Sequence, residues 1–250
     1  ALIRLEKVQD GLYAAIGAID RNDPDMYKDS DEVRAKKLAE KEKEKDYTVV
    51  DEVPYWFNGA GFTNKKRNAL FMVETEPLKI KRITAPAFNV QNILVEGKTV
   101  YYTGALFEQS RSMYSRLYAY HTDTKKTETV YGKNDRRFGR LFVLKGQLYA
   151  ESTMTKEHGK TAEIYKVDKE GLTCVYTPKI SLSSTTIGDT VHGGGAGEGC
   201  DGKVFVTLAT DNDHNVLYEF DRKFKPKTVW EQPGMACFMA MSDEKIALCY

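Results

Sequence analysis

The sequence predicts an all-β protein of the β-propeller class, and three observations lead to that prediction. Tyr accounts for 15 of the 250 residues, and Thr and Val are frequent, as is usual in strand-rich proteins. Gly and Pro are scattered along the chain as turn residues. Two short strand patterns alternate along the chain and recur at a period of roughly 40–50 residues. Four short antiparallel strands per repeat at this period are typical of propeller blades.

The overall composition limits the partners that we expect. A length of 250 residues is long for one average domain but common for an all-β domain. The formal net charge of +1 creates no field that would attract nucleic acid or an anionic membrane. No apolar run is long enough to span a bilayer, and the first residues lack the order of a signal peptide. We therefore expect a cytoplasmic protein with neither nucleic-acid nor membrane partners.

The cysteines and histidines indicate neither a metal site nor a cofactor. The cysteines form no C-x-x-C pair, and two of them lie in apolar runs where a thiol usually serves as a small hydrophobe. A disulfide is the alternative that their spacing leaves open. The histidines lie in different repeats without the spacing of zinc ligands. The residues concerned are Cys174, Cys200, Cys237 and Cys249, and His121, His158, His192 and His214.

The first 66 residues contain two predicted strands followed by an insertion. Residues 1–19 predict two strands joined at Gln9-Asp10-Gly11. Between Lys28 and Asp46, fourteen of nineteen residues are charged, and Asp29 followed by Glu32 is typical of a helix start. Composition favours a solvated insertion at residues 20–66 within the first blade of a propeller domain that spans residues 1–250. The alternative is a mobile flap that contacts a partner.

The insertion ends in an aromatic stretch from Asp51 to Phe62. It places four aromatic side chains around Pro54 and two glycines, which predicts a rigid, largely buried loop with Trp56 and Phe57 in the core. Trp56, Trp230 and the repeated tyrosines would form a binding platform in the alternative interpretation. Aromatics at strand period favour packing between blades instead.

The two repeated patterns predict the number of blades. The first reads turn, glycine and aromatic-bearing strand, and its copies start at Asp10, Glu96, Lys145, Asp201 and, without the glycine, Asp243. The second combines apolar and aromatic residues, and its copies start at Leu70, Leu117, Ile164 and Leu217, at intervals of 47, 47 and 53 residues. We expect four blades and half of a fifth. Because a propeller that stops within a blade exposes strand edges, we expect the chain to be part of a longer protein.

The aromatic stretch also carries a family resemblance. Pro54-Tyr55-Trp56-Phe57-Asn58-Gly59-Ala60-Gly61-Phe62 follows Thr48-Val49-Val50-Asp51 and precedes Ala69-Leu70-Phe71-Met72-Val73 and Lys81-Arg82-Ile83-Thr84. In this order the chain resembles the N-terminal β-propeller of serine peptidases of the prolyl oligopeptidase family, in particular the acylaminoacyl-peptidase-like enzymes. The resemblance is specific over residues 20–84 and loose elsewhere. The Trp-Ser-Pro-Asp-Gly signature common in such propellers is absent.

The resemblance implies a function for the chain. In this family a propeller, commonly of seven blades, lies over a separate α/β-hydrolase domain that carries a Ser-Asp-His triad and follows downstream. The propeller admits short or unfolded peptides to the active site. This chain would then contribute no catalytic, cofactor or metal residues, and its partners would be the hydrolase domain and peptide substrates. Homo-oligomerisation and peptide specificity stay open, and a free-standing propeller that binds proteins is the alternative.

Two further motifs mimic functional sites. Val191-His192-Gly193-Gly194-Gly195 is similar to the oxyanion-hole run of α/β-hydrolases. Because no Gly-x-Ser-x-Gly nucleophile elbow occurs in the chain, we interpret the run as a loop between blades, with an esterase-like site at His192 as the alternative. Residues 211–215 begin like a calcium loop, but Val216 and Arg222 replace its glycine and glutamate. We expect a polar turn there.

Overall fold

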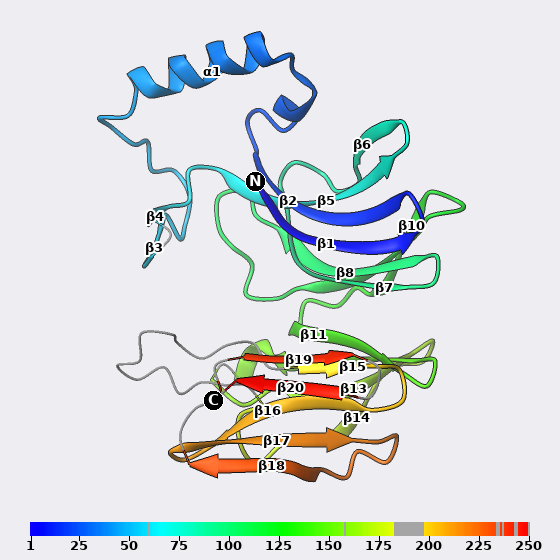
Figure 1. The fold of residues 1–250 in the computed structure, drawn as a ribbon. Helices are drawn as coiled ribbons and strands as arrows, with labels where there is room; N and C mark the ends of the chain where they lie inside the picture. Colours follow the sequence, from blue (N-terminus) through cyan, green and yellow to red (C-terminus); the bar gives the residue numbers. More distant parts are fainter. Residues whose placement is uncertain are drawn as a thin grey trace. The chain divides into compact units, whose positions relative to one another are not determined.

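The structure is a computed structural model that describes residues 1–59, 61–157, 159–182, 198–233, 236, 238–242 and 245–249. These residues form two compact units, Ala1–Asn134 and Asp135–Tyr250, each of which is built from antiparallel sheets (Figure 1). No helix in the described part of the chain is long and apolar enough to cross a membrane.

The first unit contains two four-stranded sheets. The first sheet has the order β1-β2-β5-β6 and the second has the order β10-β9-β8-β7. The strands of the first sheet are β1 (Leu2–Gln9), β2 (Leu12–Asp20), β5 (Lys66–Thr75) and β6 (Leu78–Arg82). Those of the second sheet are β7 (Phe88–Glu96), β8 (Thr99–Leu106), β9 (Arg116–His121) and β10 (Lys126–Tyr131).

The second unit contains two four-stranded sheets and a two-stranded sheet. The third sheet along the chain, which is the first of this unit, consists of β11 (Arg136–Leu144), β12 (Gln147–Met154), β13 (Glu163–Asp168) and β14 (Gly171–Tyr176). The short helix η2 (Thr155–Glu157) lies between β12 and β13. The fourth sheet consists of β15 (Glu198–Cys200), β16 (Phe205–Asp211), β17 (His214–Phe220) and β18 (Lys227–Pro233). β19 (Phe238–Ser242) pairs with β20 (Lys245–Cys249).

The repeated sequence patterns correspond to fixed strands of these sheets. The first pattern forms the second strand of each sheet, namely β2, β8, β12, β16 and β20, and the second pattern forms the third strand, namely β5, β9, β13 and β17. The glycine of the first pattern has a positive φ at Gly11 (73°) and Gly97 (54°), which a residue with a side chain rarely adopts. The predicted four-stranded blades are confirmed, and the described residues form four of them and the β19–β20 pair.

Aromatic side chains fill the space between neighbouring sheets of each unit. In the first unit Ala14, Ile16, Leu70 and Met72 of the first sheet share one buried cluster with Phe88, Val90, Ile93, Val100, Tyr102 and Tyr120 of the second. In the second unit Phe142 of β11 stacks on Phe205 of β16, with ring centroids 4.0 Å apart. One twisted sheet cannot bury both faces alone, so these clusters stabilise the repeat. The packing role predicted for the repeated tyrosines is confirmed for Tyr102, Tyr120 and Tyr149, which are buried in these clusters.

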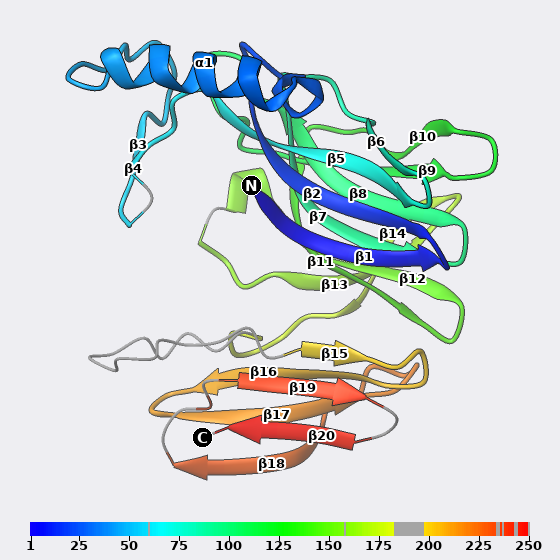
Figure 2. The same cartoon turned by 45° about the horizontal axis from the view of Figure 1, so that its top comes forward.

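The insertion connects β2 to β5, whose ends pair at Asp20 and Lys66. It comprises η1 (Met26–Lys28), α1 (Asp31–Lys43), β3 (Trp56–Phe57) and β4 (Gly61–Phe62). Because successive strands run in opposite directions, the β2–β5 and β8–β9 connections leave the sheets at the same rim of the first unit. Figure 2 shows α1 and the β3–β4 hairpin at this rim.

Candidate functional site

The helix of the insertion is largely exposed, with Arg34 and Lys37 half-buried, and it is attached through its charges. Ser30 caps α1 by accepting a hydrogen bond from the Val33 N–H at 3.3 Å, so the predicted start at Asp29 was one residue early. The Lys37 Nζ lies 2.9 Å from Asp23 and 2.7 Å from Asp29. No residue of α1 is buried. Ion pairs at the surface stabilise a fold by less than about 1 kcal/mol each, so α1 adds little stability.

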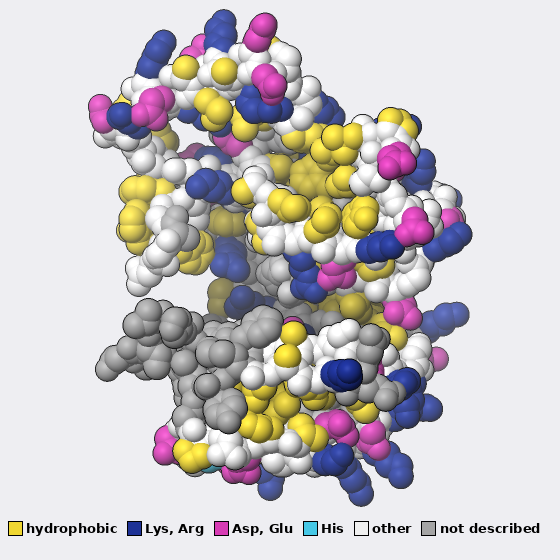
Figure 3. Space-filling model, in the orientation of Figure 1, with side chains coloured by type: hydrophobic (Ala, Val, Ile, Leu, Met, Phe, Trp, Pro, Cys, Tyr) yellow, Lys and Arg dark blue, Asp and Glu magenta, His cyan; other side chains and the backbone are white. Residues whose placement is uncertain are grey.

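The aromatic stretch is an exposed hairpin, and the prediction that it is buried was wrong. The exposed fractions are 51% for Tyr55, 49% for Trp56, 38% for Phe57 and 38% for Phe62. β3 pairs with β4 in the register Trp56↔Phe62, and these two rings meet edge to face with centroids 4.8 Å apart. Figure 3 shows hydrophobic side chains gathered where Figure 1 places β3 and β4. The physical reason is that the hairpin extends away from both sheets, so its aromatic side chains pack mainly on one another.

Backbone geometry explains the glycines of the aromatic stretch. Gly59 and Gly61 have φ values of 78° and 73°, in the left-handed region that side chains disfavour. A Cβ on Gly61 would lie 3.8 Å from the Trp56 ring, which is ordinary van der Waals contact, so the backbone conformation and not the space favours glycine here. Asn58-Gly59 is a frequent hairpin turn, and this signal could have predicted the hairpin from the sequence.

A buried ion pair attaches the base of the hairpin to the first sheet. The Arg67 guanidinium donates to Glu52 Oε2 at 2.5 Å and to the Phe107 carbonyl at 2.8 Å, and the side chains are 0% and 4% exposed. The Arg67 guanidinium also lies 3.6 Å from the centroid of the Phe107 ring. Glu52 Oε1 accepts from the Lys65 N–H at 2.9 Å. The Glu52 carboxylate thus joins the segment that enters the hairpin to the segment that leaves it.

The ion pair also sets the protonation state of Glu52. Burial alone would raise the pKa of the Glu52 carboxyl, but hydrogen bonds from Arg67, Thr63 and the Lys65 backbone outweigh it and lower the pKa to about 2. Glu52 is therefore ionised at neutral pH. Beside it, Asp51 is paired with Lys65.

The β8–β9 connection holds the hairpin from the second sheet. The Val53 N–H donates to the Gln109 carbonyl at 2.8 Å, and the Arg111 N–H donates to the Val53 carbonyl at 2.8 Å. The Arg111 guanidinium lies 5.7 Å from the centroid of the Phe57 ring. Arg21, at the start of the insertion, donates to the Glu108 carbonyl. The base of the hairpin is therefore fixed by both sheets of the first unit.

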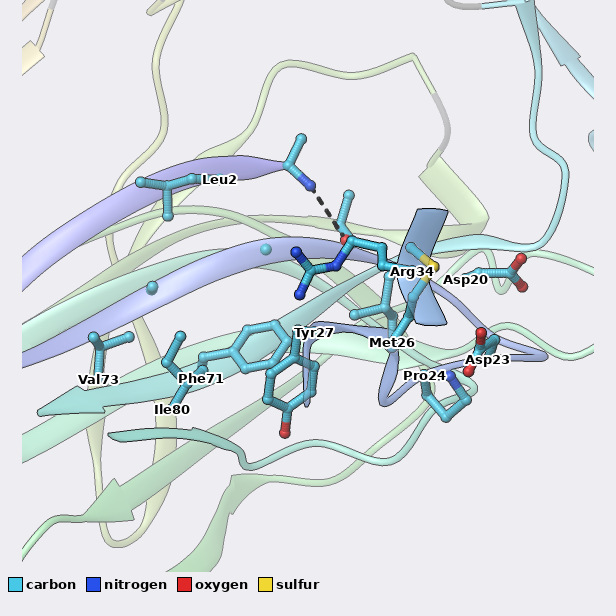
Figure 4. A pocket seen from close by; sticks show the side chains of 15 residues that line it. Leu2, Asp20, Asp23, Pro24, Met26, Tyr27, Arg34, Phe71, Val73 and Ile80 are labelled. Atoms are coloured by element: carbon cyan, nitrogen blue, oxygen red, sulfur yellow. Dashed lines mark hydrogen bonds between the residues drawn. The ribbon is translucent and has the colours of Figure 1, made fainter. Parts of the chain in front are cut away.

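A pocket of about 390 Å³ lies on the face of the first sheet that points away from the second (Figure 4). Phe71, Ile80 and Leu2 form part of its apolar wall, and Tyr27 of η1 meets Phe71 edge to face with centroids 5.2 Å apart. The corresponding face of the second sheet, with Val100 and Tyr102, packs on the first sheet. The pocket therefore lies on the face of the first sheet that corresponds to the packed face of the second sheet.

A second charge cluster, in which Glu151 is buried and Arg140 is half-buried, lies between the third and fourth sheets. The Arg140 guanidinium donates to Glu198 Oε2 at 2.8 Å and to Thr207 Oγ1 at 2.7 Å, and it also pairs with Glu151. Burial raises the pKa of Glu151, and the charge of Arg140 offsets this in part. The cluster joins β11 and β12 to β15 and β16.

The remaining predicted residues contribute no chemistry that the structure describes. His158, His192 and Gly193–Gly195 lie outside the described residues, as do the side chains of Cys237 and Cys249. Cys174 and Cys200 are exposed, and the Cys200 thiol donates to the Val143 carbonyl at 3.0 Å. Residues 211–215 form the turn between β16 and β17, as predicted, with Asn212 at φ 51°. Among the described residues, no group of three or more His, Cys, Asp or Glu could hold a metal ion.

Comparison with known proteins adds the fold relationship. No family model and no curated protein matches the sequence. Among solved structures, the acylaminoacyl peptidase of Pyrococcus horikoshii matches 99% of this chain and 34% of its own, with a TM-score of 0.65 and 15% identity. This chain has a β-propeller fold. A prolyl endopeptidase structure matches 94% of this chain and 28% of its own, with a TM-score of 0.50 and 14% identity.

These matches confirm the resemblance to propellers of the prolyl oligopeptidase family at the level of the fold. The β-propeller domain of the Trilobed protease from Pyrococcus furiosus also matches, with a TM-score of 0.49 and 13% identity over 90% of this chain and 50% of that one. The chain spans 34% of the length of the acylaminoacyl peptidase and 28% of that of the prolyl endopeptidase.

Proposed function

We propose that this chain is the non-catalytic β-propeller of a cytoplasmic serine peptidase of the prolyl oligopeptidase family, and that it controls the access of peptides to a separate α/β-hydrolase domain. The observation that carries the proposal is the fold match to an acylaminoacyl peptidase over 99% of this chain but 34% of the peptidase. The absence of a Gly-x-Ser-x-Gly elbow from the sequence supports a non-catalytic role.

The proposed mechanism is steric selection at the rim that carries the insertion. The hairpin is fixed at its base by the Glu52–Arg67 ion pair and by the Val53 backbone bonds to Gln109 and Arg111, so it is a firm obstacle. α1 is exposed and attached by surface ion pairs, so it moves at low cost. A fixed hairpin beside a weakly attached helix suits a gate that admits extended peptides and excludes folded proteins.

Two measurements test this proposal. Reading the gene beyond the codon for Tyr250 should reveal a Gly-x-Ser-x-Gly elbow followed by Asp and His, and its absence from the full open reading frame would contradict the peptidase function. A serine-directed fluorophosphonate should label the full-length protein and leave the isolated chain of 250 residues unlabelled. Labelling of the isolated chain would favour an active-site serine within it.

The second candidate function is a free-standing propeller that binds other proteins. The exposed aromatic hairpin favours it, because contiguous exposed apolar groups mark interaction sites. An open reading frame that ends with the propeller would support this candidate over the first.

A further inference from the structure

We infer that the face of the first sheet that carries the pocket, called the Phe71 face below, is an interface for a further four-stranded sheet of the same polypeptide, and that η1 of the insertion forms part of this interface. A free-standing propeller would need the same contact, so the interface does not depend on the proposed function. Three features of the structure support it: the open apolar surface of the Phe71 face, the packing of the equivalent faces of other sheets, and the attachment of η1 to the Phe71 face.

The Phe71 face is apolar and partly open to solvent. Directly opposed residues of antiparallel strands lie on the same face of a sheet. The register pairs Ala15 with Phe71 and Val73 with Ile80, so side chains of β2, β5 and β6 meet on this face. Leu2 and Ile80, on the two edge strands of the sheet, line the pocket and are 66% and 42% exposed. A contiguous exposed apolar face of this kind marks an interaction site.

The equivalent face of the second sheet is packed against another sheet. Ala15 is the fourth residue of β2 and Tyr102 is the fourth residue of β8, and both strands follow a two-residue turn. Their partners on the third strand are Phe71 and Tyr118. Tyr102 is buried against aliphatic side chains of β2 and β5 and stacks on Tyr118, with ring centroids 5.1 Å apart. A sheet with aliphatic side chains at the same positions therefore fits the Phe71 face.

The fourth sheet repeats this arrangement with the third. Tyr218 of β17 corresponds to Phe71 in the second sequence pattern, and it packs against a cluster that the third and fourth sheets share. Thr207, which pairs with Tyr218, accepts a hydrogen bond from the Arg140 guanidinium of β11 at 2.7 Å. Both contacts join sheets that are consecutive along the chain. We therefore assign the sheet that covers the Phe71 face to the same polypeptide.

η1 is attached to the Phe71 face and occupies part of it. The Tyr27 ring meets Phe71 edge to face, with centroids 5.2 Å apart (Figure 4). Arg82, which pairs with Phe71 across β5 and β6, lies 3.4 Å from the Asp25 carboxylate. A sheet packed over the pocket would therefore contact η1 as well. The insertion would be held at its root between two sheets, and its motion would be confined to the residues after Lys28.

The accessibility of introduced thiols in the full-length protein tests the interface. Ile80→Cys and Lys79→Cys place a thiol on opposite faces of β6, at positions that are both exposed in this chain. Mass spectrometry of the labelled peptides gives the rate of reaction with a maleimide at each position. We expect Ile80→Cys to react about tenfold or more slowly than Lys79→Cys, because a covered thiol reacts only when the structure opens. Leu2→Cys, on the opposite edge strand, should be protected in the same way.

The outcomes separate the occupants of the Phe71 face. Protection that persists at all protein concentrations supports a sheet of the same polypeptide. Protection that disappears on dilution, together with a fall in the sedimentation coefficient, would assign the face to a second copy and overturn the inference. Reaction of Ile80→Cys and Leu2→Cys as fast as Lys79→Cys would also overturn it. If Ile80→Cys fails to fold, the rate at Leu2→Cys decides.

A substitution in η1 tests the part that the insertion takes in the interface. In the Ile80→Cys protein, Tyr27→Ala should raise the labelling rate several-fold, because it removes the ring that covers Phe71. Tyr47→Ala, which removes an exposed tyrosine elsewhere in the insertion, is the matched control and should leave the rate unchanged. An unchanged rate with Tyr27→Ala would show that η1 is not part of the interface.

These results are separable from those on the proposed function. If Ile80→Cys is protected but the open reading frame encodes no hydrolase domain, the proposed function fails and the interface stands. If a hydrolase domain is encoded but Ile80→Cys reacts freely, the interface is wrong and the proposed function stands.

Discussion

Glu52 and Arg67 form a fully buried ion pair that joins the insertion to the first sheet, with Arg67 Nη2 and Glu52 Oε2 2.5 Å apart. Breaking such a pair leaves an uncompensated buried charge, which usually costs about 3–5 kcal/mol. We expect Arg67→Met to lower the free energy of unfolding by an amount in this range, measured by urea denaturation. Lys79→Met, which removes a largely exposed cation from β6, is the control and should change it by less than about 0.5 kcal/mol. An equal effect of the two substitutions would show that the ion pair does not stabilise the fold.

The same pair predicts a pH dependence. The pKa of Glu52 is lowered from 4.5 to about 2, so its contribution to stability is fully present above pH 4.5 and is lost as the pH falls toward 2. The difference in unfolding free energy between the natural chain and Glu52→Gln should therefore shrink across this window. A shift of this size corresponds to roughly 3 kcal/mol. A difference that stays constant between pH 5 and pH 2 would contradict the assigned pKa direction.

Removing Arg140 and removing Glu151 should lower the free energy of unfolding by different amounts. Arg140→Met leaves Glu151 buried without its cation, so we expect a loss of about 3–5 kcal/mol. Glu151→Gln removes a carboxylate that burial already disfavours, while Glu198 still pairs with Arg140, so the loss should stay below about 1 kcal/mol at neutral pH. Chemical denaturation of both variants measures this contrast, and equal losses would refute it.

The sign of the pH effect at Glu151 is opposite to that at Glu52. Because folding raises the pKa of Glu151 above 4.5, its favourable contribution is present below pH 4.5 and is lost as the pH rises through the folded value. The natural chain should therefore lose stability relative to Glu151→Gln as the pH rises. A relative stability that instead increases with pH would be inconsistent with the raised pKa.

Gly61 should be required for the shape of the hairpin. Its φ of 73° lies in the left-handed region, where a residue with a Cβ costs about 1–2 kcal/mol. We expect Gly61→Ala to disorder the hairpin and to move the emission of Trp56 to the red, while the global unfolding midpoint changes little because the hairpin is exposed. An unchanged emission spectrum would show that the hairpin tolerates a side chain at this position.

The sheets could be predicted from the sequence, because their signals are local and repeated. The glycine at Gly11, Gly97, Gly146 and Gly202 marks the turn before each second strand, and the apolar-aromatic runs at Leu70, Leu117, Ile164 and Leu217 mark each third strand. Both patterns follow from backbone conformation and from the face that each sheet buries.

The exposure of the hairpin could not be predicted from its composition. Aromatic richness indicates burial in most contexts. Here contacts of Glu52, Arg67 and Gln109 hold only the base of the hairpin, so the rest extends away from both sheets and leaves Trp56 and Phe57 exposed. These residues are distant in sequence and carry no motif, so their contacts could not be predicted from the sequence and are seen in the three-dimensional structure. The Asn58-Gly59 turn was the one local signal of a hairpin.

The proposed function requires the propeller to select peptides by size. It is tested most directly by replacing residues 30–46 with a short Gly-Ser linker in the full-length protein, a deletion that leaves Tyr27 on Phe71 and removes no buried residue. We predict that turnover of long peptides rises several-fold while turnover of dipeptide-sized substrates stays unchanged. Equal changes for long and short substrates would contradict the claim.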